Sequence, residues 1–123
     1  MSLTKKQIYI VDDDASVCLA LSFLLRAYGF AVKTFVSAEA FLGLVPQSEP
    51  GCLILDIHMA GLNGWQTLAH LVKAGSPHPV IIISAEKHGE LQKKALKAGA
   101  VGFLQKPFND QDLVALINVA FQK

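Results

Sequence analysis

Residues 7–14 read Gln-Ile-Tyr-Ile-Val-Asp-Asp-Asp, a nearly continuous apolar run that ends abruptly in three acids. A short apolar run of this kind is typical of a β-strand covered on both faces, as strands of parallel sheets are. Runs of the same character stand at 52–55 and 80–83, and the first of them also ends in an acid, Asp56. The sequence therefore predicts buried strands that carry polar side chains at their carboxyl ends.

Segments with a helical period alternate with these strands. Two further short apolar runs complete the predicted strands, and they occupy 31–35 and 101–104. Hydrophobic residues recur on one helical face in the segments between them. The predicted helices lie at 15–28, 38–44, around 68–72, around 91–98 and at 110–121. Tyr28 is expected on the apolar face of the first helix, and Val72 marks the apolar face of the third.

Glycines and capping residues agree with these boundaries. Gly29, Gly75 and Gly99 each follow a helical pattern, where a left-handed C-terminal cap favours glycine. Ser37 can cap the second helix, and Asn109 or Asp110 the last. The alternation of strands and helices predicts an α/β protein, a (βα)5 doubly wound fold with a parallel five-stranded sheet and helices on both faces.

The length of 123 residues fits a single domain, 1–123. We take 1–5 as an N-terminal extension, of which Met1-Ser2-Leu3 is expected to be a cloning remnant. The chain has 11 Lys and Arg against 10 Asp and Glu, a formal net charge of +1, which argues against binding nucleic acid or a membrane through a basic field.

The composition also predicts the compartment. The longest aliphatic run, 80–83, is far shorter than the roughly 20 residues of a membrane span. Cys18 and Cys52 stand in apolar stretches and are expected to be buried thiols, which favours a reducing compartment, the cytoplasm. The other candidate ligands show no metal-binding spacing and are expected at the surface: His70, His78 and His88.

Polar side chains cluster at the predicted carboxyl ends of the strands, where open α/β sheets bind ligands. Asp12 and Asp13 follow the first strand, Asp56 the third, Ser84 ends the fourth and Lys106 follows the fifth. Converging carboxylates raise each other's pKa, and a hard cation such as Mg²⁺ relieves their repulsion. A carboxylate can serve as a nucleophile toward phosphorus, and a lysine can pair with phosphoryl oxygens. The pattern predicts a Mg²⁺-dependent phosphoryl site, although the acids after the first strand could instead simply cap the first helix.

The chain resembles a receiver domain of a two-component response regulator along essentially its whole length. The segments that carry the resemblance are 8–14, 53–59, 82–85, 97–100 and 103–108. The stretch 29–42 further resembles the FixJ-type subgroup. The resemblance implies the flavodoxin-like (CheY-like) strand order 2-1-3-4-5, a known example of this fold class.

The resemblance also implies roles for single residues. Asp56 would accept a phosphoryl group from a sensor histidine kinase. Asp13, Asp56 and the backbone carbonyl of His58 would bind Mg²⁺ directly, and Asp12 would act largely through a metal-bound water. Lys106 would contact the acids and then the phosphoryl group.

A switch is implied as well. Ser84 would turn toward the phosphoryl group and Phe103 would turn inward behind it, while the Lys106–Pro107 bond would be cis. The output face would be the fourth helix, fifth strand and fifth helix, where a phosphorylation-dependent homodimer could form. Such a dimer would join the lysines of the fourth helix to acids of the fifth: Lys93, Lys94 and Lys97, with Asp110 and Asp112.

The implied protein is a phospho-acceptor switch and not an enzyme, since it promotes only its own phosphorylation and dephosphorylation. It would not bind nucleic acid itself. If the subgroup resemblance holds, it would control a helix-turn-helix transcription domain outside this chain; the alternative is a stand-alone receiver.

The sequence departs from the family pattern at three places: Ala60 stands where proline is usual, Ser84 where threonine is common, and Phe103 where tyrosine is also common. The residues two positions after the acceptor and the switch hydroxyl, which tune phosphoryl lifetime in the family, are His58 and Glu86.

Three other functions stay open on the sequence. A haloacid-dehalogenase-type phosphatase would use Asp12 as its nucleophile, and Asp12 and Asp14 satisfy its Asp-x-Asp pattern. A phosphorylation-independent interaction domain would keep only the scaffold. A flavin-binding domain would need a Ser-, Thr- and Gly-rich loop where the three acids stand.

Overall fold

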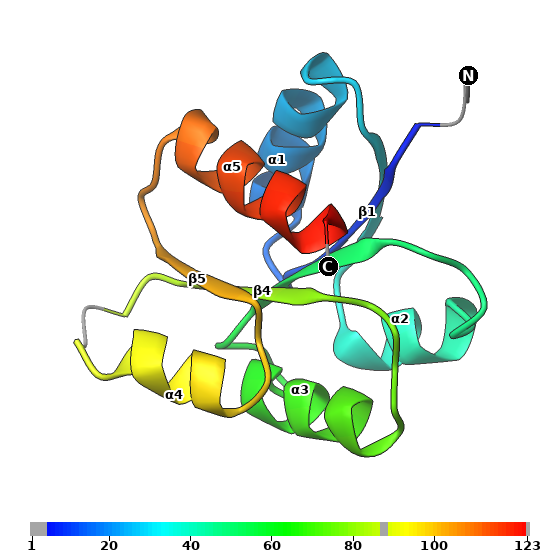
Figure 1. Ribbon diagram of the computed structural model, residues 1–123, viewed down its shortest axis with the longest axis vertical. Helices are drawn as coiled ribbons and strands as arrows, with labels where there is room; N and C mark the ends of the chain where they lie inside the picture. The colour runs from blue at the N-terminus through cyan, green and yellow to red at the C-terminus, as the bar shows by residue number, and fades with distance from the viewer. Residues whose placement is uncertain (1–4, 87–88, 123) are drawn as a thin grey trace.

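The computed structural model describes residues 5–86 and 89–122, and its strands form one parallel sheet (Figure 1). The strands lie in the order β2-β1-β3-β4-β5, which confirms the predicted fold class and strand order. Their bounds are β1 Gln7–Val11, β2 Ala31–Phe35, β3 Cys52–Asp56, β4 Val80–Ser84 and β5 Gly102–Gln105. Strands β3 and β4 are one residue longer than the apolar runs, so that Asp56 and Ser84 are themselves strand residues.

Helices cover both faces of the sheet. Their bounds are α1 Ala15–Ala27, α2 Ala38–Leu44, α3 Gly64–Lys73, α4 Leu91–Lys97 and α5 Asp110–Phe121. Figure 1 shows α1 and α5 on one face, and α2, α3 and α4 on the other. Within the described ranges no helix combines the length and the apolar character needed to cross a membrane. Residues 1–4 of the predicted extension lie outside the described residues.

The interior strands feed two separate cores, because side chains alternate between the faces of a strand. On β1, Ile8 and Ile10 pack with α1 and α5, whereas Tyr9 and Val11 pack with the helices of the other face. Strands β1, β3 and β4 have neighbours on both sides and helices on both faces. This explains why their sequences are nearly continuous apolar runs.

Side-chain caps begin the helices as predicted. Asp14 accepts the backbone N–H groups of Ser16 and Val17 at the start of α1, so one of the three acids does cap the helix. Ser37 caps α2 and Asn109 caps α5 in the same way. These caps place the first turn of each helix directly beyond the carboxyl end of the preceding strand, which is the edge that carries the acids.

Three predictions of burial were wrong. Tyr28 is 47% exposed because it follows the last residue of α1 and leaves the helical face, and Val72 is 55% exposed in the last turn of α3. His78, expected at the surface, is buried. Its ring nitrogens lie against Ser76 Oγ and the carbonyl of Glu49, which satisfies the imidazole inside the fold. His88 lies outside the described residues.

Candidate metal and phosphoryl site

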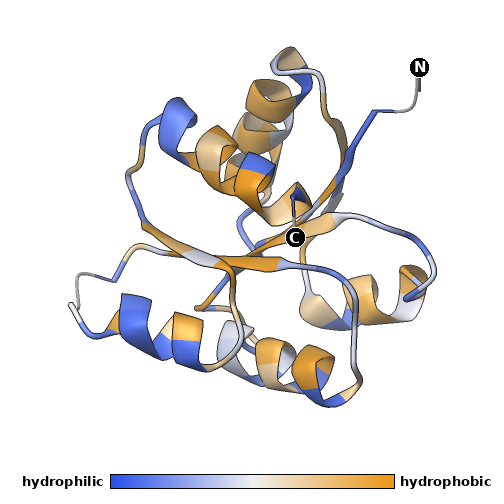
Figure 2. Ribbon diagram, in the orientation of Figure 1, coloured by the Kyte–Doolittle hydropathy of each residue, from blue (hydrophilic) through white to orange (hydrophobic). Residues whose placement is uncertain are grey.

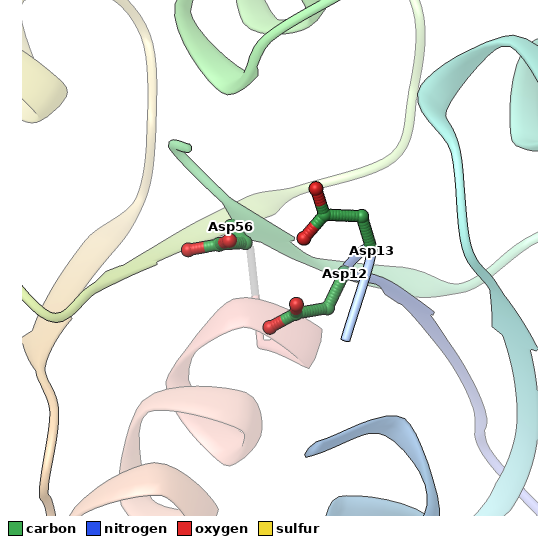
Figure 3. Close-up of side chains that lie close together, drawn as sticks. All are labelled: Asp12, Asp13 and Asp56. Atoms are coloured by element: carbon green, nitrogen blue, oxygen red, sulfur yellow. The ribbon is translucent and has the colours of Figure 1, made fainter. Parts of the chain in front are cut away.

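Parallel pairing brings the acids together. Val11 of β1 lies opposite Leu55 of β3, so the residues that follow them, Asp12 and Asp56, emerge side by side. One carboxylate oxygen from each of Asp12, Asp13 and Asp56 lies within 4.8 Å of the others. Figure 3 shows the three side chains gathered at the ends of β1 and β3. The carboxyl edge of the sheet therefore concentrates negative charge in one small space.

Lys106 supplies a positive charge to this cluster. Its Nζ lies 3.0 Å from Asp12 Oδ2 and 3.7 Å from Asp56 Oδ1. Its backbone N–H donates to the carbonyl of Ser84 at 2.7 Å, which fixes the segment after β5 against β4. The following Lys106–Pro107 bond is cis, as the resemblance implies. The lysine thus reaches across from the edge strand to the two buried acids.

The three acids differ in how far they are buried and in which groups contact their carboxylates. Asp12 is 1% exposed, and both of its oxygens have donors, Oδ1 from the Asp14 N–H and Oδ2 from Lys106. Asp13 is exposed, whereas Asp56 is buried. Burial raises the pKa of Asp56, the charges of Asp12 and Asp13 raise it further, and Lys106 opposes them. An added cation beside Asp56 would therefore offset the electrostatic cost of ionising its carboxyl group.

The donor set fits a magnesium ion. All the converging atoms are carboxylate oxygens, which Mg²⁺ prefers over nitrogen and sulfur. Mg²⁺ also keeps several waters, and the exposure of Asp13 leaves solvent access on that side. Asp12, Asp13 and Asp56 are thus the residues suited to hold the ion.

The two proposed switch residues share one face of the sheet. Phe103 on β5 pairs with Ile82 on β4, and both belong to the core under α2, α3 and α4. Ser84 stands two residues after Ile82, so it points to the same face. Ser84 is buried and its Oγ accepts the Glu86 N–H at 3.0 Å, while Phe103 is half-buried.

The structure brings together a pair that the sequence did not. His58 Nε2 lies 2.6 Å from Glu86 Oε2, and both side chains stand exposed beside the site, on the segments after β3 and β4. Only the resemblance marked these positions, since they are 28 residues apart.

A second feature missed from sequence is an exposed apolar patch on α1. Leu19 and Phe23 are 59% and 68% exposed, one helical turn apart. In Figure 2 α1 is largely hydrophobic in colour, whereas α4 is largely hydrophilic. The signal was present in the sequence, as apolar residues at i and i+4 outside the buried stripe.

Comparison with known proteins agrees with this geometry. The family model of the response regulator receiver domain matches residues 8–118. The transcriptional regulatory protein FixJ of Bradyrhizobium diazoefficiens is 41% identical over 120 residues, which cover 98% of this chain and 58% of that protein. The response regulator protein TmoT of Ectopseudomonas mendocina is 45% identical over 115 residues, covering 94% of this chain and 52% of that protein.

Solved structures show the same relationship. The crystal structure of FixJ-N superimposes with a TM-score of 0.89 at 36% identity, over 98% of this chain and 96% of that one. The chain spans about half the length of the curated relatives it matches, 58% and 52% of the two named above. Fold, motif order and sequence identity agree over nearly the whole chain, and the chain therefore belongs to the family of response regulator receiver domains of two-component systems.

Proposed function

We propose that Asp56 is the phosphoryl acceptor of this receiver domain, that Mg²⁺ is its cofactor and that a sensor histidine kinase is its phosphodonor. The observation that carries the proposal is the convergence of Asp12, Asp13, Asp56 and Lys106 at the carboxyl edge of the sheet. Asp56 is buried and its pKa is raised, and its carboxylate lies 3.7 Å from Lys106 Nζ, farther than the 3.0 Å that separates Asp12 from the same ammonium.

The chemistry follows from these positions. A carboxylate oxygen of Asp56 attacks the phosphorus of a phosphohistidine, a P–O bond forms, and the P–N bond breaks with its electron pair returning to the imidazole. Lys106, 3.7 Å from Asp56, offers its ammonium to the phosphoryl oxygens. The carboxylates of Asp12, Asp13 and Asp56 and the backbone carbonyl of His58 would hold Mg²⁺, which when bound would neutralise further charge on the phosphoryl group.

The switch uses residues already placed beside the acceptor. The Ser84 hydroxyl exchanges its contact with the Glu86 N–H for a phosphoryl oxygen. Phe103 then moves into the core on the same face, and this shift biases the position of α4 and β5. The face formed by α4, β5 and α5 is the output surface, where lysines on α4 of one copy and acids on α5 of a second copy would support a phosphorylation-dependent homodimer.

The kinase covers the apolar patch of α1 in this proposal. Leu19 and Phe23 stand on a helix that begins directly after the acid cluster, so a protein that brings a phosphohistidine to Asp56 meets them. Exposed apolar surface of this kind marks protein contact sites. The free thiols Cys18 and Cys52 agree with the cytoplasm as the compartment.

The relatives' names support a transcriptional output. FixJ is called a transcriptional regulatory protein and is longer than the matched region. We infer that this domain controls a transcription domain outside the described chain, and that it is itself a switch without turnover of other substrates.

The competing functions fit less well. A phosphatase that uses Asp12 would need a free carboxylate there, but Asp12 is 1% exposed and holds Lys106 at 3.0 Å. A phosphorylation-independent domain would have no reason to keep three acids and a lysine in one cluster, because converging like charges cost stability.

Intact mass spectrometry tests the proposal. The protein is incubated with Mg²⁺ and acetyl phosphate, with Asp56→Asn and an EDTA sample as controls. One phosphoryl increment is expected in the wild type alone, and only with Mg²⁺. A phosphoryl group that hydrolyses quickly would escape this measurement. A second assay therefore uses beryllofluoride in place of the phosphoryl group and follows its binding by the fluorescence of Trp65, the single tryptophan. Silence in both assays, or an increment that Asp56→Asn retains, would remove Asp56 as acceptor.

A further inference from the structure

Two carboxylates from outside the loop between β3 and α3 accept its backbone N–H groups, and a third, that of Glu86, contacts the side chain of His58 in the loop. This loop, residues 57–63, follows Asp56 directly and carries His58. The backbone N–H of Ala60 donates to Asp13 Oδ2 at 3.3 Å, and the N–H of Leu62 donates to Glu39 Oε2 at 3.4 Å. Asp13 belongs to the acid cluster, whereas Glu39 lies in the first turn of α2.

Glu39 also makes a close approach to the residue between these two amides. Gly61 has a φ of +72°, in the left-handed region that favours glycine. A Cβ built on Gly61 would lie 2.8 Å from Glu39 Oε2, so the carboxylate rests against the bare backbone. The turn at Gly61 thus has room for the Glu39 carboxylate because no side chain stands there.

The local sequence gives the loop little stiffness of its own. Ala60 and Gly61 leave the backbone dihedrals free, and glycine loses the most conformational freedom on folding. An alanine at position 60 keeps the N–H that reaches Asp13, which a proline would lack. The far end of the loop is fixed by Asn63, whose capping box with Gln66 begins α3. Between Asp56 and Asn63, Glu39 anchors the loop from α2 at Leu62, while Asp13 holds the backbone at Ala60 and Glu86 contacts the side chain of His58.

We propose that Glu39 is a positioning residue for the metal site. It anchors the loop at Leu62, so that the neighbouring Ala60 N–H holds the Asp13 carboxylate in the orientation that Mg²⁺ requires. Asp13 is exposed, and without this restraint its side chain must be ordered when the ion binds, which lowers the affinity. The inference rests on the proposed function, since it concerns the same Mg²⁺ site.

Mg²⁺ titrations followed by Trp65 fluorescence test the role of Glu39. Glu39→Asp keeps the charge and the acid in the first turn of α2 but is one methylene too short to reach Leu62. We expect its Kd for Mg²⁺ to rise roughly tenfold, the lower end of the loss that follows removal of an outer partner of a metal ligand. Glu39→Gln keeps the acceptor without the charge, and its Kd should stay within about twofold of wild type. Asp110→Ala, which removes a first-turn acid of α5 instead, is the matched control and should bind like wild type.

Amide NMR supplies a readout that general destabilisation would not move. The Leu62 and Ala60 resonances should shift together in Glu39→Asp and remain near wild type in Glu39→Gln. Equal Mg²⁺ affinity in wild type and Glu39→Asp would overturn the inference while leaving phosphorylation of Asp56 intact. Equal weakening in Glu39→Gln and Glu39→Asp would also overturn it, because Glu39→Gln keeps the acceptor for the Leu62 N–H and loss of that hydrogen bond could not then be the cause. A wild type that binds no Mg²⁺ would overturn both this inference and the proposed function.

Discussion

Replacing Asp56 with asparagine should stabilise the protein when Mg²⁺ is absent. The Asp56 carboxylate lies within 4.8 Å of those of Asp12 and Asp13 and 3.7 Å from Lys106 Nζ. With an effective dielectric constant of ~20, each repulsion costs about 3.5 kcal/mol and the lysine returns about 4.5 kcal/mol. Solvent around the exposed Asp13 screens its charge and so reduces the repulsion between Asp13 and Asp56. We therefore expect Asp56→Asn to raise the free energy of unfolding by about 1–2 kcal/mol, or roughly 3–8 °C in Tm.

The pH dependence of this gain has a defined sign. Burial, and then the charge of Asp12, raises the pKa of Asp56 above its ordinary value of 3.8, so the folded protein holds this proton more tightly than the unfolded chain. The ionised carboxylate costs stability progressively as the pH rises from 3.8 through the raised pKa. Asparagine has no such dependence. The difference between the two proteins should be full near neutral pH and should shrink as the pH falls toward 3.8.

Urea unfolding with and without Mg²⁺ is the assay. Circular dichroism and Trp65 fluorescence should report coincident transitions for wild type and Asp56→Asn in EDTA. A Mg²⁺ concentration of ten times Kd stabilises the wild type by about 1.4 kcal/mol, and the variant, lacking a ligand, gains less. The difference in free energy of unfolding between Asp56→Asn and the wild type should therefore become smaller, or change sign, when Mg²⁺ is added. An Asp56→Asn protein that is no more stable than wild type in EDTA, or whose advantage persists unchanged at low pH, would refute the repulsion argument.

Three further substitutions probe other parts of the structure. Lys106→Ala should still be phosphorylated by acetyl phosphate but should signal and dimerise less. Its free energy of unfolding should fall by about 2 kcal/mol, because the charge of Asp12 stays buried without the ammonium group beside it. Full phosphorylation-dependent dimerisation, measured by size-exclusion chromatography, would contradict the proposed role of the lysine. Phe23→Ser, at a 68% exposed position, should change the free energy of unfolding by no more than about 0.5 kcal/mol. It should slow phosphotransfer from the kinase but leave phosphorylation by acetyl phosphate at the wild-type rate. Equal slowing with both phosphodonors would show that α1 is not part of the kinase interface. His78→Ala should lower the free energy of unfolding, measured by chemical denaturation, by about 2 kcal/mol. The substitution leaves a cavity at a buried site and leaves the Glu49 carbonyl without its hydrogen-bond partner. A loss under about 0.5 kcal/mol would mean that the cavity collapses or fills with water.

The order of strands and helices could be predicted because each element carries a local pattern. Apolar runs such as 80–83 indicated buried strands, and the acids after β1 and β3 had to meet because parallel strands end at one edge. The same local reasoning overextended α1 to Tyr28, since the last turn of a helix has no marker for where its side chains leave the core.

Contacts between distant segments could not be predicted in this way. The burial of His78 depends on a carbonyl 29 residues away, and the partner of His58 is 28 residues away in another loop. Glu39 stood in the sequence only within the stretch 29–42 that resembles the FixJ-type subgroup, with no role of its own. Its proximity to Leu62 follows from how α2 packs beside the loop after β3, which no sequence period encodes.

The sheet divides the interior into two cores, and each core underlies a different outer face of the domain. Two partners can therefore bind the domain on opposite sides of the sheet. The exposed apolar side chains of α1 belong to one side of the sheet, while Ser84, Phe103 and α4 belong to the other. A rearrangement behind Ser84 would fall in the core under α2, α3 and α4, whereas the proposed kinase contact on α1 lies on the opposite face of the sheet. The proposed kinase contact and the α4 part of the proposed output surface are therefore separate, so that two partners could occupy them together.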